Sequence, residues 1–280
     1  MFGRLPVRLE RFLRSRRMIM ARSFLVTAVG VGLCWGALPQ GGSAVGDRPS
    51  KLAWGAIRGQ VTWGGKTIPR QTPLAINRDR DHCLSAGPVL SEDCVVSPKT
   101  KGVRWVLVYL VPEGKKPLPV HPDLKKPKAN EVSLDIVPGR YDPHVLAMRA
   151  GQSLIVNNPG PICYNINWYG VGPKAQSGNV LMKPQDRYVI RDLKPERLVI
   201  HMRDNIHPWM KAWIKVFDHP YFAVTDADGK FTIPKAPAGK HRLVTWQEST
   251  GWGPGGKAGV IMEIQGGRVA EVRLKLMPVE

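Results

Sequence analysis

The alternation of apolar and polar residues along the chain predicts short β-strands rather than helices. In segment 269–276, every second residue from Ala270 to Leu276 is apolar and the residues between them are charged, which is the period-two pattern of a half-buried strand. Segment 103–111 (VRWVLVYLV) is β-branched, aromatic and apolar on both faces, as in a strand at the centre of a sandwich. Beyond residue 44, the pattern does not predict an amphipathic helix.

The other strand candidates are short and are bounded by turn residues. The chain of 280 residues has 29 glycines and 25 prolines, which suits strands joined by turns and disfavours long helices. Segments 78–100 and 170–185 are predicted as loops, and 112–130 as an exposed connector. We expect an all-β fold with room for two or three domains. Strands are predicted at 55–65, 74–77, 132–137, 144–148, 153–157, 188–191, 197–202, 212–217, 221–224, 230–233, 241–246 and 260–264.

Residues 1–44 have the organisation of a secretory signal peptide. A basic segment with seven arginines leads into an apolar run from Ser23 to Leu38, which is short for a membrane span. Pro39 ends the run, and small residues follow up to Ala44, where cleavage is expected. We therefore predict a periplasmic or otherwise exported protein. Its export would use the general secretory or the twin-arginine route. An uncleaved anchor is the alternative.

The chain is strongly basic, with a net charge of +19 that becomes +13 when the seven arginines and one glutamate of residues 1–44 are removed. An exported protein with this charge is attracted to anionic envelope polymers or to a lipid surface. Charge that serves solubility alone is the alternative interpretation. Nucleic acid is not expected as a partner, because an exported protein does not meet it and the sequence has no basic helix or RNA-binding sheet motif. A role as a subunit of a larger envelope complex is a further hypothesis.

Three cysteines remain after the predicted cleavage. Cys83 and Cys94 are close in sequence and flank a Gly-Pro turn, so in an oxidising compartment they form the predicted disulfide, with Cα atoms within about 7 Å. Two free thiols are the alternative. Cys163 is left over and is interpreted as a small apolar residue.

Motifs at both ends of the mature chain resemble one family, and motifs in the middle resemble another. Segments 57–61, 65–69, 226–234 and 237–243 resemble the carboxypeptidase regulatory-like (transthyretin-like) β-sandwich. Between them, segments 142–146 and 151–158 and the block His207-Pro-Trp-Met210 resemble cupredoxin-like envelope proteins of the methylamine-utilisation type.

These resemblances imply the domain organisation. They imply a cupredoxin-like Greek-key β-sandwich at residues 130–218. It is inserted in, or flanked by, a carboxypeptidase regulatory-like β-sandwich formed by residues 54–118 and 219–278. Insertion is preferred because neither flanking segment supplies a complete strand set alone, and insertions are tolerated where loop ends lie close together. Three modules in a row are the alternative.

The cupredoxin resemblance also implies where a copper site would lie. Such a site uses two histidines, one cysteine thiolate and a weak axial methionine. His207 and Met210 stand at two of these positions, but Asp204 stands at the cysteine position and Tyr164 at that of the first histidine. We therefore expect a vestigial site of Tyr164, Asp204, His207 and Met210 that holds no cofactor. Copper, or another metal bound with Cys163, is the alternative.

No signature of an enzyme is present in the sequence. A Gly-x-Ser-x-Gly elbow, a His-Glu-x-x-His motif and a phosphate-binding glycine loop are all missing. The sequence thus predicts an exported, non-enzymatic envelope protein that acts in binding or assembly. A periplasmic copper-binding electron-transfer or copper-handling protein is the alternative.

Overall fold

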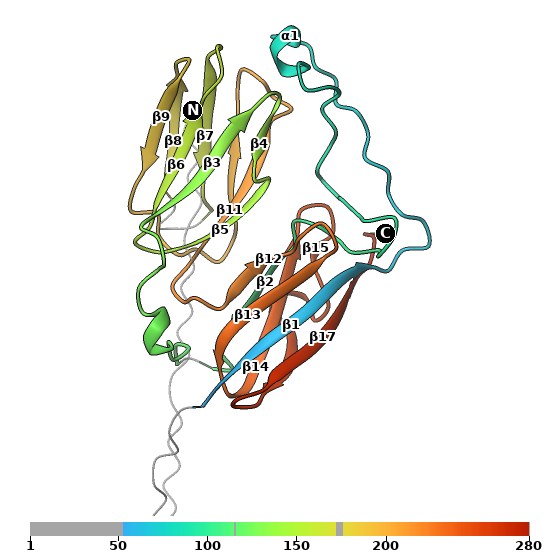
Figure 1. Ribbon diagram of the computed structural model, residues 1–280, viewed down its shortest axis with the longest axis vertical. Coiled ribbons are helices and arrows are strands. Elements are labelled where there is room, and N and C mark those ends of the chain that lie inside the picture. The colour runs from blue at the N-terminus through green and yellow to red at the C-terminus, as the bar shows by residue number, and fades with distance from the viewer. Residues whose placement is uncertain (1–52, 115, 172–175, 280) are drawn as a thin grey trace, which may run out of the picture. The chain divides into compact units, whose positions relative to one another are not determined.

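The computed structural model describes residues 53–114, 116–171 and 176–279, which belong to one compact unit (Figure 1). The predicted signal peptide, residues 1–44, lies outside the described residues. Within those ranges, the helices are too short and too polar to cross a membrane.

The strands nearest the two ends of the described chain form a first β-sandwich. One sheet has the order β13–β1–β17, with bounds Lys230–Pro237, Trp54–Trp63 and Val269–Leu276. Figure 1 shows blue β1 between β13 and β17. The other sheet has the order β12–β2–β14–β15, with β16 also paired to β14; the bounds are Phe222–Val224, Leu107–Val111, Gly239–Gln247, Gly251–Trp252 and Val260–Ile264.

This first sandwich joins segments that lie on opposite sides of residues 130–218. In the antiparallel pair β1–β13, Ile57 lies opposite Ile233. In the antiparallel pair β2–β14, Tyr109 lies opposite Val244. Ile57, Ile233 and Leu243 belong to one buried cluster. The expected contacts between the early and late segments are therefore present, whereas the family of this sandwich and the domain boundaries remain predictions.

The strands of the middle segment form a second sandwich. One sheet has the order β4–β3–β6–β9, with bounds Arg140–Asp142, Glu131–Val137, Ser153–Asn158 and Asp186–Ile190. The facing sheet has the order β5–β11–β10–β7–β8, with bounds Val145–Arg149, Lys211–Phe217, Ile200–Arg203, Tyr164–Tyr169 and Ser177–Met182. Alternate side chains from both sheets, among them Leu134, Leu154, Ile166 and Ile214, fill one buried core.

Helical structure is limited to single turns in the described chain. They are the α-helix α1 (Arg80–Cys83) and the 3-10 helices η1 (Pro122–Leu124) and η2 (Gly256–Ala258). The helix α1 lies in the long connection between β1 and β2. Its Cys83 packs with Ile76 and Val89 in a small apolar cluster.

The structure differs from the sequence-based expectations at several places, and one of them is strand β7, which the sequence did not predict. Segment 74–77 is not a strand, and only an isolated bridge joins Pro73 to Leu90. The predicted loop 170–185 contains edge strand β8. Its signal is weak because its exposed and partly buried residues alternate without a strong apolar face.

A further difference concerns the predicted disulfide. Cys83 and Cys94 are both free thiols in the structure. Cys83 packs with Ile76 and Val89, whereas Cys94 packs against the core of the first sandwich. The two side chains therefore belong to different clusters, although only ten residues separate them in sequence.

Candidate functional site

The four residues of the predicted vestigial site come from two segments that strand pairing brings together. Tyr164 begins β7, and the other three lie in the loop between β10 and β11. Strands β7 and β10 are antiparallel, with Arg203 opposite Asn167, so the end of β10 lies beside the start of β7. As a result, the Tyr164 and His207 rings lie 4.8 Å apart between their centroids.

Asp204 is the centre of the hydrogen bonds in this loop. Its side chain is fully buried. Its Oδ1 accepts hydrogen bonds from the backbone N–H groups of Ile206 (2.6 Å) and His207 (3.0 Å). Its Oδ2 accepts one from the backbone N–H of Asn165 (3.0 Å) and lies 3.1 Å from Nδ1 of His207. The Asp204 carboxylate thus stabilises the loop between β10 and β11 and joins this loop to β7.

His207 is held from both sides of its ring. Its Nδ1 faces Asp204, and its Nε2 lies 2.9 Å from Oδ2 of Asp79, which comes from the connection that carries α1. Burial alone would lower the pKa of His207, but the hydrogen bonds to Asp204 and Asp79 outweigh burial and raise it. We call Asp204, His207 and Asp79 the Asp–His–Asp chain.

Met210 and Tyr164 complete the predicted set. Met210 is buried in the core of the second sandwich, and its backbone N–H donates to the carbonyl of His207 (2.9 Å). The backbone N–H of Asp204 in turn donates to the carbonyl of Met210 (3.2 Å). The Tyr164 hydroxyl is buried without a hydrogen-bond partner among the described residues, and burial raises its pKa.

The segment around α1 covers this end of the second sandwich, which the sequence did not predict. Asp79 reaches His207, and the His82 ring lies 6.3 Å from that of Tyr164, between centroids. The pKa of the buried Cys83 thiol is raised by burial and by the carboxylate of Asp79. The contact of this segment with the second sandwich gave no sequence signal, because the segment has no periodic pattern.

The residues at this position do not fit a blue-copper centre. Copper of that type needs a thiolate, and the carboxylate of Asp204 occupies the expected place. Both ring nitrogens of His207 already face carboxylate oxygens. Across residues 53–114, 116–171 and 176–279, no group of three or more His, Cys, Asp and Glu side chains is arranged to hold a metal ion. Cys163 is exposed and is not part of the Asp–His–Asp chain.

A second buried polar cluster lies near the same loop. His144, before β5, places Nε2 2.6 Å from Oε2 of Glu248, after β14. Lys211 forms ion pairs with Glu248 and with Asp93, the latter at 2.9 Å. Burial would raise the pKa of Glu248, but the hydrogen bonds from His144 and Lys211 outweigh burial and lower it to about 2. This cluster links the two sandwiches.

Because the pKa of Glu248 is low in the folded protein, the free energy of unfolding is expected to decrease at acid pH. A carboxyl group whose pKa is depressed by folding contributes stability above its unfolded-state pKa, here 4.5, and that contribution is lost as the pH falls. A pKa shift from 4.5 to about 2 corresponds to about 3 kcal/mol in the free energy of unfolding. We expect the free energy of unfolding, measured with urea, to fall more steeply between about pH 4.5 and 2 for the wild type than for Glu248→Gln. Parallel profiles would contradict this.

The comparisons with known proteins give a partial likeness of fold. No family model matches the chain, and no curated protein matches it. An oxidised methionine-to-leucine mutant of amicyanin is 20% identical, covers 31% of this chain and 81% of its own, and has a TM-score of 0.27. A purple cupredoxin from Nitrosopumilus maritimus is 20% identical, covers 30% of this chain and 98% of its own, and has a TM-score of 0.26.

The chain is therefore an all-β protein with several sheets, one region of which resembles a cupredoxin fold. The resemblance extends over about a third of the chain. It assigns no role to any residue of this protein. None of the matches described above is to a carboxypeptidase regulatory-like domain.

Proposed function

We propose that the protein is an exported, non-enzymatic envelope protein with a copper-free cupredoxin-like module, and that it acts in binding or assembly. The module is the second sandwich, and it is inserted between the two parts of a carboxypeptidase regulatory-like sandwich. The sequence motifs support the family of the first sandwich, and the pairing of β1 with β13 and of β2 with β14 supports the insertion.

One observation carries the copper-free part of this proposal. At the place where a cupredoxin would bind its metal, the Asp–His–Asp chain uses both ring nitrogens of the single histidine. A hard carboxylate oxygen does not replace a soft thiolate in electron transfer. The site is thus built as a buried polar support for the loop between β10 and β11.

The binding role is supported by the charge of the chain. The basic mature protein suits an anionic polymer or lipid surface of the envelope as its partner. A subunit role in a larger envelope complex would use the same scaffold.

Voltammetry of the purified protein tests this proposal against the rival electron carrier. After exposure to copper and removal of the unbound metal, the wild-type protein is expected to show no reversible one-electron wave. Amicyanin, loaded in the same way, serves as the positive control. A reversible copper wave from the wild type would overturn the proposal.

A further inference from the structure

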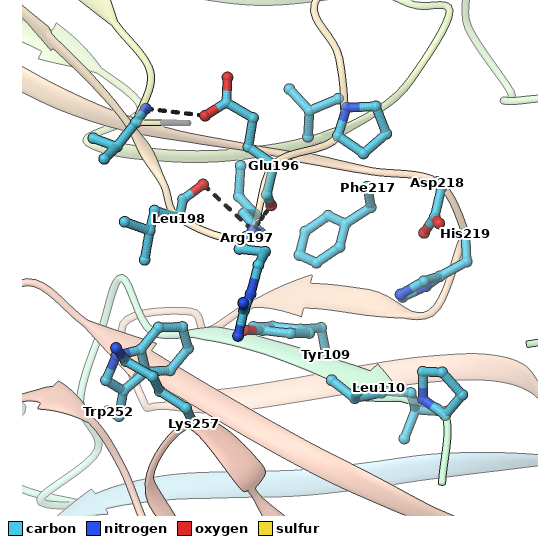
Figure 2. A pocket seen from close by; sticks show the side chains of 16 residues that line it. Tyr109, Leu110, Glu196, Arg197, Leu198, Phe217, Asp218, His219, Trp252 and Lys257 are labelled. Carbon is cyan, nitrogen blue, oxygen red and sulfur yellow. Dashed lines mark hydrogen bonds between the residues drawn. The ribbon is translucent and has the colours of Figure 1, made fainter. Parts of the chain in front are cut away.

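One cavity formed by the described residues lies away from the Asp–His–Asp chain. It has a volume of about 660 Å³ and is bordered by β2, β11, β15 and segment 195–198 (Figure 2). Its apolar lining includes the rings of Tyr109, Phe217 and Trp252. Aromatic rings of this kind offer flat surfaces for an apolar or aromatic ligand.

A buried lysine contributes to the wall of this cavity. Lys215, in β11, has only 4% of its surface exposed. Its Nζ donates to the backbone carbonyls of Glu196 and Leu198 and lies 5.6 Å from the centroid of the Phe217 ring. Burial lowers the pKa of Lys215 to about 8, so the amine is still mainly protonated at neutral pH.

The positive charge of Lys215 has no close counter-ion. Among the described residues, no carboxylate oxygen lies within 4 Å of its Nζ. The Glu196 carboxylate is turned away and accepts a hydrogen bond from the backbone N–H of Val171 (3.0 Å). A buried cation without an ion-pair partner is costly, and an anion in the cavity would reduce that cost.

Two more cations line the cavity, and they are exposed. Arg197 and Lys257 also lie beyond 4 Å of every described carboxylate. Figure 2 shows the guanidinium of Arg197 reaching toward Tyr109. Asp218 is the other acid of the lining and is exposed. The lining therefore combines three cations, two acids and aromatic rings.

We propose that this cavity is a binding site for a small organic anion with a flat, apolar or aromatic body. The rings of Tyr109, Phe217 and Trp252 hold the body, and Lys215 and Arg197 attract the acidic group. The inference deepens the binding role proposed above and rests on it, because it names a ligand class. It does not depend on the copper-free state of the second sandwich.

Fluorescence titration with 1-anilinonaphthalene-8-sulfonate tests the proposal, because this probe joins an aromatic body to an anionic group. The uncharged N-phenyl-1-naphthylamine has the same aromatic body without the sulfonate. The variants are Lys215→Met, which replaces the lysine with an uncharged, unbranched side chain one atom shorter, and Arg197→Gln at the exposed edge. Lys240→Met removes the same charge from an exposed lysine outside the cavity and is the matched control.

The expected result is one sulfonate site per chain, with affinity reduced about tenfold or more by Lys215→Met and by Arg197→Gln. Lys240→Met leaves the affinity unchanged, and the uncharged probe binds about tenfold more weakly than the sulfonate. Equal affinities for wild type, Arg197→Gln and Lys240→Met would overturn the proposal, as would equal binding of the two probes. Arg197→Gln keeps the test valid if Lys215→Met does not fold. None of these outcomes bears on copper, so this proposal and the copper-free proposal fail separately.

Discussion

Replacing Asp204 with alanine is expected to lower the free energy of unfolding by about 3–5 kcal/mol. The substitution removes the acceptor for three backbone N–H groups, those of Asn165, Ile206 and His207. Each buried donor left without a partner costs about 1–3 kcal/mol. The imidazole of His207 also loses the carboxylate at its Nδ1. Chemical denaturation of the wild type and the variant measures the difference.

The matched control for this prediction is Glu131→Ala in the same sandwich. Glu131 forms an exposed ion pair with Arg187 at 3.0 Å, and such pairs contribute about 0–1 kcal/mol. A loss for Asp204→Ala no larger than that for Glu131→Ala would contradict the role assigned to the buried carboxylate.

The double substitution Tyr164→His and Asp204→Cys is expected to create a coloured copper site. Nδ1 of His207 faces position 204, so a cysteine thiolate placed there would lie on the same side of the imidazole as the present carboxylate. The centroids of the Tyr164 and His207 rings are 4.8 Å apart, so a histidine at position 164 would lie close to His207. Asp79 would orient the imidazole through Nε2, as outer carboxylates do in metal sites.

Copper content and visible absorption measure this second prediction. The double variant is expected to bind one copper per chain with an intense thiolate-to-copper band, and Asp204→Cys alone is expected to do less. The combination of Tyr164→His with Asp204→Ser is the matched control, because it has no thiolate. A folded double variant that takes up no more copper than this control would contradict the geometry described here.

Much of the strand pattern could be predicted from the sequence, because alternation reports burial directly. In β17, Leu274 and Leu276 are buried and the charged residues between the apolar positions are exposed, as the pattern indicated. The strands β7 and β8 were not predicted, because their sequences lack this alternation. Their asparagines and Gly178 interrupt the apolar pattern, and pairing between the two strands supplies the order that the pattern lacks.

The candidate site could be predicted only in part. The positions of Tyr164, Asp204 and His207 followed from the resemblance, and the structure brings them together. Asp79 could not be found in this way, because its contact with His207 joins residues 128 apart in the chain. The pairing of His144 with Glu248, 104 residues apart, depends in the same way on tertiary structure.

The cavity around Lys215 could not be predicted from the sequence either. Its lining combines β2, β11 and β15 with a loop, and no short motif unites them. The sequence indicated a strongly basic protein. Only the fold places a lysine without a close counter-ion beside Phe217 and Tyr109.

We propose that the end of the second sandwich at which His207 lies between Asp204 and Asp79 binds no copper. The most direct measurement is the copper content of the purified wild-type protein after incubation with copper and removal of the unbound metal, together with its visible spectrum. Far less than one copper per chain and no intense visible band is the predicted result. One tightly bound copper per chain with such a band would contradict the account.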